Sequence, residues 1–327
     1  MKMYNLLLLC LYNFEITLCQ DIEMSHKVTK ITEPVVLGEG PHWDERVQAL
    51  YFVSIHEQTI HKYVPATKEH TRTKLNGRVG FIVPVEGRTD QFVVGVELKF
   101  LLVQWDGKNN SEAKLLKELC EVDQQTKNRL NDGKADPRGR LYAGTMGHEE
   151  PPGVFVQEAG SLFVLERASA RARTLAARVG ISNGLAWDER NRAMYYVDSM
   201  DKHIRKYDWD PDTGNISNMT YVFDFVKNGI AGVGDGGTID TDGNLWWCVF
   251  DGSCVLQIDP NTGKVLRKID IPAKQVTSCT FGGPNFDTLF VTTASMTIGE
   301  EQKPPCGSCF MVTGLGVKGY PNVNVKL

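Results

Sequence analysis

Four short segments of this chain restart in the same way, and this repetition limits the folds that it can adopt. Each segment runs from a glycine to an aspartate and is followed by a polar turn and a hydrophobic strand; the segments are residues 40–44, 133–136, 184–188 and 237–240. A weaker copy begins at Cys279, and the gap between the first two clear copies leaves room for one more near residues 80–95. Six repeats of roughly 40 to 50 residues, each a run of short strands, are typical of a β-propeller.

Alternation of side chains and enrichment in β-branched and aromatic residues predict the strands of these repeats. The predicted strands are residues 49–53, 59–63, 81–85, 91–96, 101–105, 141–145, 161–165, 193–198, 203–208, 244–250, 253–259 and 288–292. Asp-Gly, Asp-Pro and similar turn signals separate them, and no long amphipathic helical pattern interrupts them. We therefore predict an all-β fold, a six-bladed β-propeller with a central metal pocket, whose repeated aromatic residues pack between the sheets.

Composition excludes some classes of partner. The net charge of −4 gives no reason to expect nucleic acid or an anionic membrane as a partner. No run approaches the roughly 20 apolar residues of a membrane span. A small molecule bound at the centre of the ring is the partner that this architecture favours, and the sequence does not indicate an oligomeric state.

The N-terminus has the order of a secretory signal peptide. Lys2 precedes the apolar run of residues 6–12, and small residues at 17–19 come before Gln20. We therefore predict a signal peptide over residues 1–19, a single propeller domain over residues 20–327, and a secreted protein. An extra N-terminal strand or a disordered leader is the alternative for this segment, and the cytoplasm is the alternative localisation.

Cysteine usage leaves the redox compartment open. Six cysteines follow the predicted leader, an even number that permits disulfides without requiring them. Cys306 and Cys309 have CxxC spacing, but neither a second CxxC nor a neighbouring histidine accompanies them, which argues against zinc. A local bridge or two free thiols are both consistent with this pair.

Polar residues gather at the start of the repeats, where the central pocket of a propeller opens. Four successive repeat starts place a carboxylate or carboxamide next to glycine or close to it; the polar residues there are Glu39, Arg129, Asn131, Asp132, Asn183 and Asp235. Carboxylate and amide oxygens are the ligands that Ca²⁺ and Mg²⁺ prefer. An Asx-Gly pair that caps its own turn is the alternative at any single segment. Arg129 is costly to bury unless it binds an anion or a carboxylate.

The same segments resemble a known family. Residues 38–43, 128–134 with 144–146, 182–185 with 195–199, and 281–283 are similar to the regucalcin, senescence-marker-protein and gluconolactonase family, which includes the luciferin-regenerating enzymes. Residues 312–319 are similar to its animal regucalcin branch. The resemblance covers residues 30–327.

The resemblance implies a six-bladed propeller with one divalent metal ion. It assigns the metal ligands to Glu39, Asn183 and Asp235, and substrate binding to Arg129, Asn131 and Glu149. Ca²⁺ is the favoured ion, with Zn²⁺, Mg²⁺ and Mn²⁺ as alternatives.

Three positions depart from the family's pattern. Ser54 stands where the family has Asp, Gly234 where it has Pro, and Gly237 where it has a larger residue. The metal triad is intact. The small residue at position 237 predicts a looser pocket wall beside Asp235.

Together with the resemblance, these features predict a metal-dependent hydrolase of sugar lactones that is gluconolactonase-like and binds calcium, with glucono-δ-lactone as an example of its substrate. Asp235 is the predicted general base, because it would lie against the cation that polarises the lactone carbonyl. Two alternatives remain, a calcium-binding regulator without catalysis and a luciferin-regenerating type of enzyme acting on another substrate. Arg129 and Asn131 favour an enzyme, because a pure calcium binder needs no guanidinium beside its ion.

Overall fold

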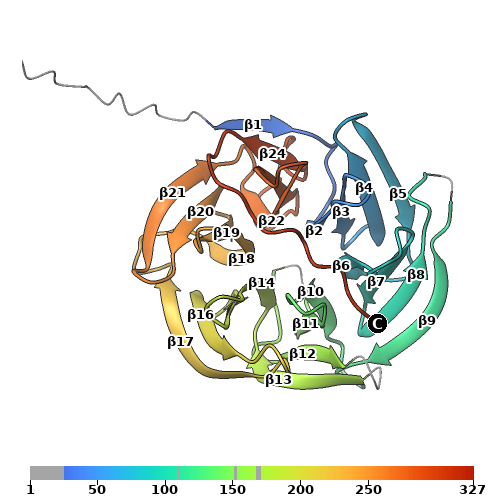
Figure 1. Ribbon diagram of the computed structural model, residues 1–327, viewed down its shortest axis with the longest axis horizontal. Coiled ribbons are helices and arrows are strands. Elements are labelled where there is room, and N and C mark those ends of the chain that lie inside the picture. Colours follow the sequence, from blue (N-terminus) through green and yellow to red (C-terminus); the bar gives the residue numbers. More distant parts are fainter. Residues whose placement is uncertain (1–25, 110, 151–152, 167–170) are drawn as a thin grey trace, which may run out of the picture.

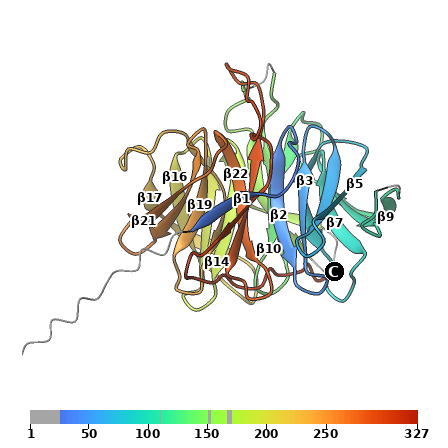
Figure 2. The ribbon, with the colours of Figure 1, turned by 90° about the horizontal axis from the view of Figure 1, so that it is seen from above.

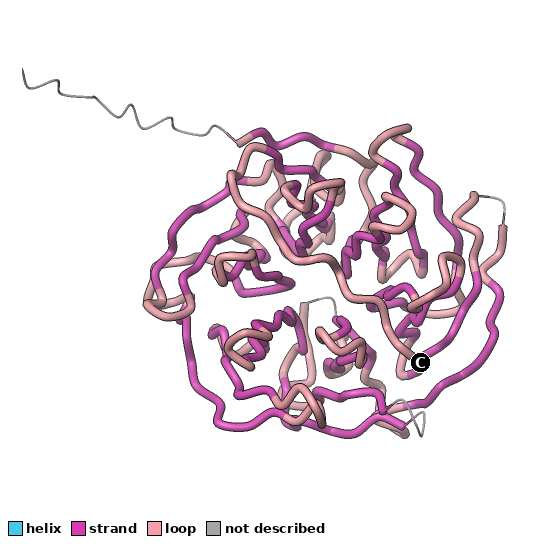
Figure 3. The backbone as a smooth tube through the Cα atoms, viewed as in Figure 1, coloured by secondary structure: helices cyan, strands magenta, loops and turns pink. Residues whose placement is uncertain are grey.

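The computed structural model describes residues 26–109, 111–150, 153–166 and 171–327, and within these ranges the regular secondary structure is β-strand alone (Figure 3). Six four-stranded antiparallel sheets stand as blades around a central axis (Figure 1). The predicted six-bladed all-β propeller is thus confirmed. Among the described residues there is no helix with the length and apolar character of a membrane span. The predicted signal peptide, residues 1–19, lies outside the described residues and stays a prediction.

The strands of each blade follow one another from the axis outward. The innermost strands are β2 (Gly38–Asp44), β6 (Val79–Pro84), β10 (Arg129–Ala135), β14 (Ser182–Asp188), β18 (Val233–Ile239) and β22 (Gln275–Gly282). The second strands are β3 (Ala49–Ser54), β7 (Gln91–Val96), β11 (Leu141–Met146), β15 (Ala193–Asp198), β19 (Leu245–Phe250) and β23 (Thr288–Ala294). The third strands are β4 (Thr59–Val64), β8 (Lys99–Gln104), β12 (Gly160–Glu166), β16 (His203–Trp209), β20 (Cys254–Asp259) and β24 (Phe310–Thr313). The outermost strands are β5 (Glu69–Lys74), β9 (Lys114–Glu121), β13 (Arg171–Val179), β17 (Ile216–Asp224), β21 (Lys264–Asp270) and β1 (Lys27–Lys30).

The innermost strands differ from their prediction in one respect. The sequence pattern placed the polar segments just before the strands, but the structure places Glu39, Asn131, Asn183 and Asp235 inside β2, β10, β14 and β18. The reason is a β-bulge in each strand, which lets glycine and polar residues continue a strand that they would normally end. The register of the innermost strand shifts at the same place in all six blades: between Glu39 and His42, Val79 and Phe81, Leu130 and Gly133, Ser182 and Leu185, Gly234 and Gly237, and Val276 and Ser278.

Aromatic side chains connect neighbouring blades, as predicted. Four ring pairs with centroids 4.8–5.5 Å apart join residues of different sheets: Trp43 with Phe290, Tyr51 with Phe92, Tyr142 with Trp187, and Trp246 with Phe281. Such pairs add about 0.5–1.5 kcal/mol each beyond the area that they bury. The blades are therefore held to one another by a ring of packed side chains, which keeps the innermost strands at fixed positions around the axis.

Both ends of the described chain contribute to closing the ring. Strand β1 pairs with β24 from Lys27 opposite Thr313 to Lys30 opposite Phe310, so the sixth sheet combines N-terminal and C-terminal strands. After β24 the chain crosses one face of the ring and ends beside β6, where Val325 pairs with Val85 (Figure 1). Two loops, after β11 and after β23, rise from the opposite face (Figure 2).

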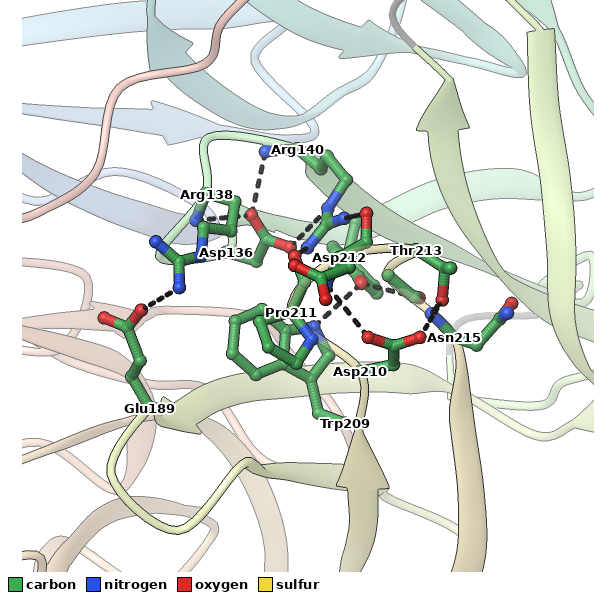
Figure 4. A network of polar contacts seen from close by, with 12 residues as sticks. Asp136, Arg138, Arg140, Glu189, Trp209, Asp210, Pro211, Asp212, Thr213 and Asn215 are labelled. Atoms are coloured by element: carbon green, nitrogen blue, oxygen red, sulfur yellow. Dashed lines mark hydrogen bonds and ion pairs between the residues drawn. The ribbon is translucent and has the colours of Figure 1, made fainter.

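A buried aspartate ends the innermost strand of four blades and accounts for much of the sequence repeat. Asp44, Asp136, Asp188 and Asp240 each accept a hydrogen bond from a backbone N–H two or three residues later. Figure 4 shows Asp136, whose carboxylate also accepts from the backbone N–H and from Nε of Arg140 at 2.9 and 2.7 Å. Arg140 in turn donates to the Pro211 and Asp212 carbonyls of the next blade.

The Asp136 network generates a stability prediction. Asp136→Ala should lower the free energy of unfolding by roughly 2–4 kcal/mol, because it leaves buried N–H groups and the Arg140 guanidinium without their acceptor. Urea denaturation would measure the change. The matched control is Asp212→Ala, which lies in the same network but is exposed and contributes its backbone carbonyl; its effect should stay within about 0.5 kcal/mol. Equal effects of both substitutions would contradict this role for Asp136.

Candidate functional site

A cavity of about 240 Å³ lies at the end of the axis where the innermost strands begin, below the loops that follow β11 and β23. Its polar wall comes from side chains of four blades and their loops: Glu39, Arg129, Asn131, Glu149, Asn183, Ser199, Asp235 and Asp251. All six residues that the sequence predicts for the site are in this set. Their roles stay predictions, but the fold brings them to one place.

Glu39 of β2 and Asp235 of β18 form a buried pair of acids. Burial raises the pKa of Glu39 well above its ordinary range, and the charges of Asp235 and Asp132 raise it further. Burial and the charge of Asp132 likewise raise the pKa of Asp235. Both carboxyl groups resist ionisation in this buried site. A nearby cation would stabilise their ionised forms.

The orientation of Asn183 is determined by Ser199, a site residue that the sequence analysis did not identify. The Ser199 hydroxyl donates its single proton to the Gly234 carbonyl at 2.7 Å, so it must accept at its other contact, which is Asn183 Nδ2 at 2.9 Å. Asn183 therefore presents its amide nitrogen to Ser199 and its oxygen to the opposite side, where Asn131 Nδ2 donates to it at 3.1 Å.

Arg129 and Asn131 meet on β10, as their spacing predicted. Arg129 Nη1 donates to Asn131 Oδ1 at 2.6 Å, and Asn131 Nδ2 also donates to the Ser182 carbonyl at 2.9 Å. Burial, together with the charge of Arg78, lowers the pKa of Arg129 to about 10. A continuous chain of hydrogen bonds thus runs from the guanidinium through Asn131 and Asn183 to Ser199.

Trp247 of β19 holds the backbone at Asp235 and occupies the space beside Gly237. Its Nε1 donates to the Asp235 carbonyl at 2.9 Å. A Cβ built on Gly184 would lie 2.5 Å from the indole ring, and one built on Gly237 would lie 2.6 Å from it. The predicted looser wall is therefore wrong, because glycine at position 237 makes room for an indole that fills this wall.

The remaining acids take up separate places around the cavity. Glu149 lies on the loop after β11, where its Oε1 accepts from the Gly153 N–H at 2.7 Å. Asp251, in the turn between β19 and β20, lines the mouth and was not identified from the sequence. Asp132 instead lines a narrow cavity of about 20 Å³ deeper along the axis, together with Lys134.

The donor set fits a hard cation. Asp235 Oδ1 is buried and has no hydrogen-bond partner among the described residues, which leaves an acceptor free for a ligand. Within the described ranges, no group of three His, Cys, Asp or Glu side chains is placed to hold a metal ion. The site would instead combine the two carboxylates with the Asn183 carboxamide, an all-oxygen set of the kind that Ca²⁺ accepts. The cysteines of the described part, Cys306 and Cys309 included, are free thiols.

A larger cavity lies at the other end of the axis, between the last residues of the innermost strands and the C-terminal segment. Its volume is about 580 Å³, and His42, Lys134, Trp187 and Tyr320 are among its lining residues. Among the described residues that line it, Glu189 is the single carboxylate. The acids that could hold a cation are therefore at the opposite end, in the smaller cavity.

Comparisons with known proteins agree with the resemblance read from the sequence. A family model described as the SMP-30/gluconolactonase/LRE-like region matches residues 37–295. Regucalcin of Danio rerio is 35% identical over 294 residues, which cover 89% of this chain and 95% of the relative. The solved structure of a luciferin-regenerating enzyme is 40% identical, with a TM-score of 0.87 and coverage of 93% of this chain and 100% of that one. A regucalcin of Agrobacterium tumefaciens, described as a calcium-binding protein, is 24% identical with a TM-score of 0.79 over 91% of this chain and 97% of its own, and shows the shared fold.

The buried acids generate a prediction for the cation-free protein. Because the pKa of Glu39 is raised in the folded state, the folded protein holds a proton that the unfolded chain releases above about pH 4.3. Its stability should therefore fall as the pH rises above that value, until the folded-state pKa is passed. Glu39→Gln removes this group and should stabilise the protein at about pH 8 by roughly 1–2 kcal/mol.

Urea denaturation with a chelator present, at about pH 5 and about pH 8, would measure both effects. The matched control is Glu45→Gln in the same blade, an exposed residue whose substitution should leave stability and its pH dependence unchanged. A pH dependence that is the same in Glu39→Gln and in the unsubstituted protein would show that Glu39 does not hold the proton.

Proposed function

We propose that this chain, which belongs to the SMP-30/gluconolactonase/LRE-like family, is a lactonase that hydrolyses a small lactone with the help of one divalent cation. The observation that supports this most is the meeting of Glu39, Asn183 and Asp235 from three blades beside the Arg129–Asn131 pair. Glucono-δ-lactone, which the sequence predicts as an example of the substrate, is the reference compound for the assays.

Glu39, Asn183 and Asp235 would hold the cation through oxygen atoms, and Ca²⁺ is the ion that this set favours over Zn²⁺, Mg²⁺ and Mn²⁺. When bound, the cation supplies an electrophile that polarises the lactone carbonyl and stabilises the developing oxyanion. Asp235 would accept the proton of the attacking water. The water oxygen would bond to the carbonyl carbon, the ring C–O bond would break, and the expelled ring oxygen would take the proton back from Asp235, which leaves the open hydroxy acid.

Arg129 and Asn131 would position the substrate. The guanidinium uses Nη1 for Asn131 and the Leu130 carbonyl, so its other N–H groups are available to oxygen atoms of the lactone or of the product carboxylate. Glu149 reaches the same cavity from the loop after β11, and its second carboxylate oxygen is available to a hydroxyl. This loop and the one after β23 stand over the cavity and limit the access of water.

Two other functions use the same residues. Calcium binding without catalysis is the second candidate, and turnover of any lactone would exclude it. A reaction of the luciferin-regenerating type is the third, because a solved relative that is 40% identical carries that name. The first experiment is therefore an assay of chelator-treated protein against a panel of lactones, with Ca²⁺, Mg²⁺, Mn²⁺ and Zn²⁺ added back singly. Metal-restored hydrolysis supports the proposal, and intact Ca²⁺ binding without any hydrolysis contradicts it.

Asp235 should be needed for the chemical step. Asp235→Asn keeps an oxygen for the cation but removes the base, so it should lower kcat by about 100-fold or more while weakening Ca²⁺ binding much less. Steady-state kinetics and calorimetric Ca²⁺ titration separate the two effects. Asp242→Asn, an exposed substitution in the same blade, is the control and should change neither. Normal turnover by Asp235→Asn would assign the base to another residue.

Ser199 should act on the cation site through Asn183. Ser199→Ala frees the Asn183 amide to rotate, and Ca²⁺ affinity should fall by about tenfold or more. Ser199→Thr keeps the hydroxyl and should restore most of the affinity. Calorimetric Ca²⁺ titration reports this without an activity assay, and equal affinities of the Ala and Thr variants would mean that the hydroxyl does not orient Asn183.

A further inference from the structure

The cavity that holds the acids also has an apolar wall. Six of the apolar residues that line it are Met146, Phe155, Met200, Phe250, Met296 and Ile298. They come from β11, from the turns after β15 and β23, from the end of β19 and from the loop after β11. Methionine and aromatic side chains from separate blades thus surround the part of a ligand that points away from the acids.

The two loops over the mouth meet through this apolar wall. A Cβ built on Gly153 would lie 3.3 Å from Cγ2 of Ile298, so the loop after β11 lies close to the loop after β23. Phe155 lines the cavity from the first of these loops, and its sequence neighbours Val154 and Val156 are each more than half exposed. The apolar surface therefore continues outward beyond the cavity.

Most polar groups of the cavity are already engaged with one another. Both ends of the Asn131 and Asn183 amides have partners, and the Ser199 hydroxyl donates to Gly234 and accepts from Asn183. Glu39 and Asp235 are assigned to the cation. Among the described residues of the lining, the remaining N–H groups of Arg129, one oxygen of Glu149 and the carboxylate of Asp251 are left for a substrate.

Only three residues of the described lining keep polar groups for a substrate, whereas nine are apolar, so the lining matches a substrate with a large apolar part. A hydroxyl that enters the cavity without finding a partner weakens binding by roughly tenfold, whereas each buried methylene strengthens it by about fourfold. The volume of about 240 Å³ holds about eight water-sized groups, enough for a six-membered lactone ring and the start of an alkyl chain. The reacting carbonyl would lie at the polar base and the chain along the methionines.

We infer that the preferred substrate is a lactone with an apolar substituent on its ring, and that polyhydroxylated sugar lactones are poorer substrates. The inference rests on the proposed lactonase function and specifies its substrate class. It depends on the composition of the wall above the site and not on which cation is bound.

The test compares lactones that share one reacting ring. The values of kcat/KM for δ-octalactone, δ-valerolactone and glucono-δ-lactone are measured with Ca²⁺, after subtraction of the enzyme-free rate. We expect δ-octalactone to exceed both of the others by about tenfold or more. Equal or better turnover of glucono-δ-lactone than of δ-octalactone would overturn the inference while leaving the lactonase proposal intact.

A binding measurement keeps the inference separate from catalysis. If no lactone is hydrolysed, the proposed function fails, and calorimetric titration with two lactams that resist hydrolysis then decides the substrate class. We expect 6-propylpiperidin-2-one to bind about tenfold more tightly than D-glucono-δ-lactam. The reverse order would overturn the inference.

A matched pair of variants assigns the preference to the wall. Met200→Gln keeps the length of the side chain but adds a polar end, and should reduce the preference for δ-octalactone over glucono-δ-lactone by about three- to tenfold. Met219→Gln on the outer strand β17 makes the same change at nearly equal exposure, 43% against 42%, and should leave the preference unchanged. The same effect from both substitutions would show that the Met200 side chain does not contact the substrate.

Discussion

The candidate site depends on a bulge that recurs in the innermost strand of every blade. In a regular strand, neighbouring side chains point to opposite faces, so a polar residue and its neighbour could not both lie near the axis. At a bulge, two residues of one strand lie opposite one residue of the partner strand, and this changes the direction of their side chains. The extra residue costs ladder hydrogen bonds, and the dense packing between the blades offsets this cost. Asn183 and Asp235 lie within the bulges of β14 and β18, and Glu39 is the last paired residue before the bulge of β2, so the site is built at three bulges in different blades.

The second constraint is electrostatic. Glu39 and Asp235 are buried together, and Asp132 lies deeper along the same axis, while the cations Arg129 and Lys134 stand above and below. The aromatic pairs and the buried aspartates of the turns stabilise the ring through residues other than these acids. The molecule therefore separates the residues that stabilise its fold from those that are costly to keep in a dry pocket, a common arrangement at functional sites.

The sequence predicted the middle of each blade better than its two edges. Second strands are buried almost throughout and third strands are mostly buried or half-buried, so they form apolar runs such as Tyr51–Phe52–Val53 and their pattern is strong. Outer strands such as β5 and β9 are polar and mostly exposed, and innermost strands contain glycine and aspartate, which read as turns. The site residues were nevertheless found, because the repeat aligns them with one another.

Other parts of the site had no pattern that a sequence could display. Ser199 acts through one hydroxyl proton, and its role follows from the direction of two hydrogen bonds. The indole of Trp247 fills the space beside Gly237, although the residues are separated by a strand turn. The apolar wall consists of six residues from five segments, so their common location follows from the fold and not from their spacing.

Strand β1 completes the sixth sheet with residues that lie nearly a whole chain length from their partners in β24. During synthesis on the ribosome, β1 has no partner strand while five blades form, until β24 has been synthesised. During that time the outer edge of the first-made segment has no strand to pair with, and the first and sixth blades cannot pack against one another. The slow step of biosynthesis should therefore be the docking of the two chain ends, since this closure carries the largest loop entropy of any contact in the ring. Until then the nascent ring is open. Glu39 and Asp235 reach their final positions relative to each other only when the ring closes.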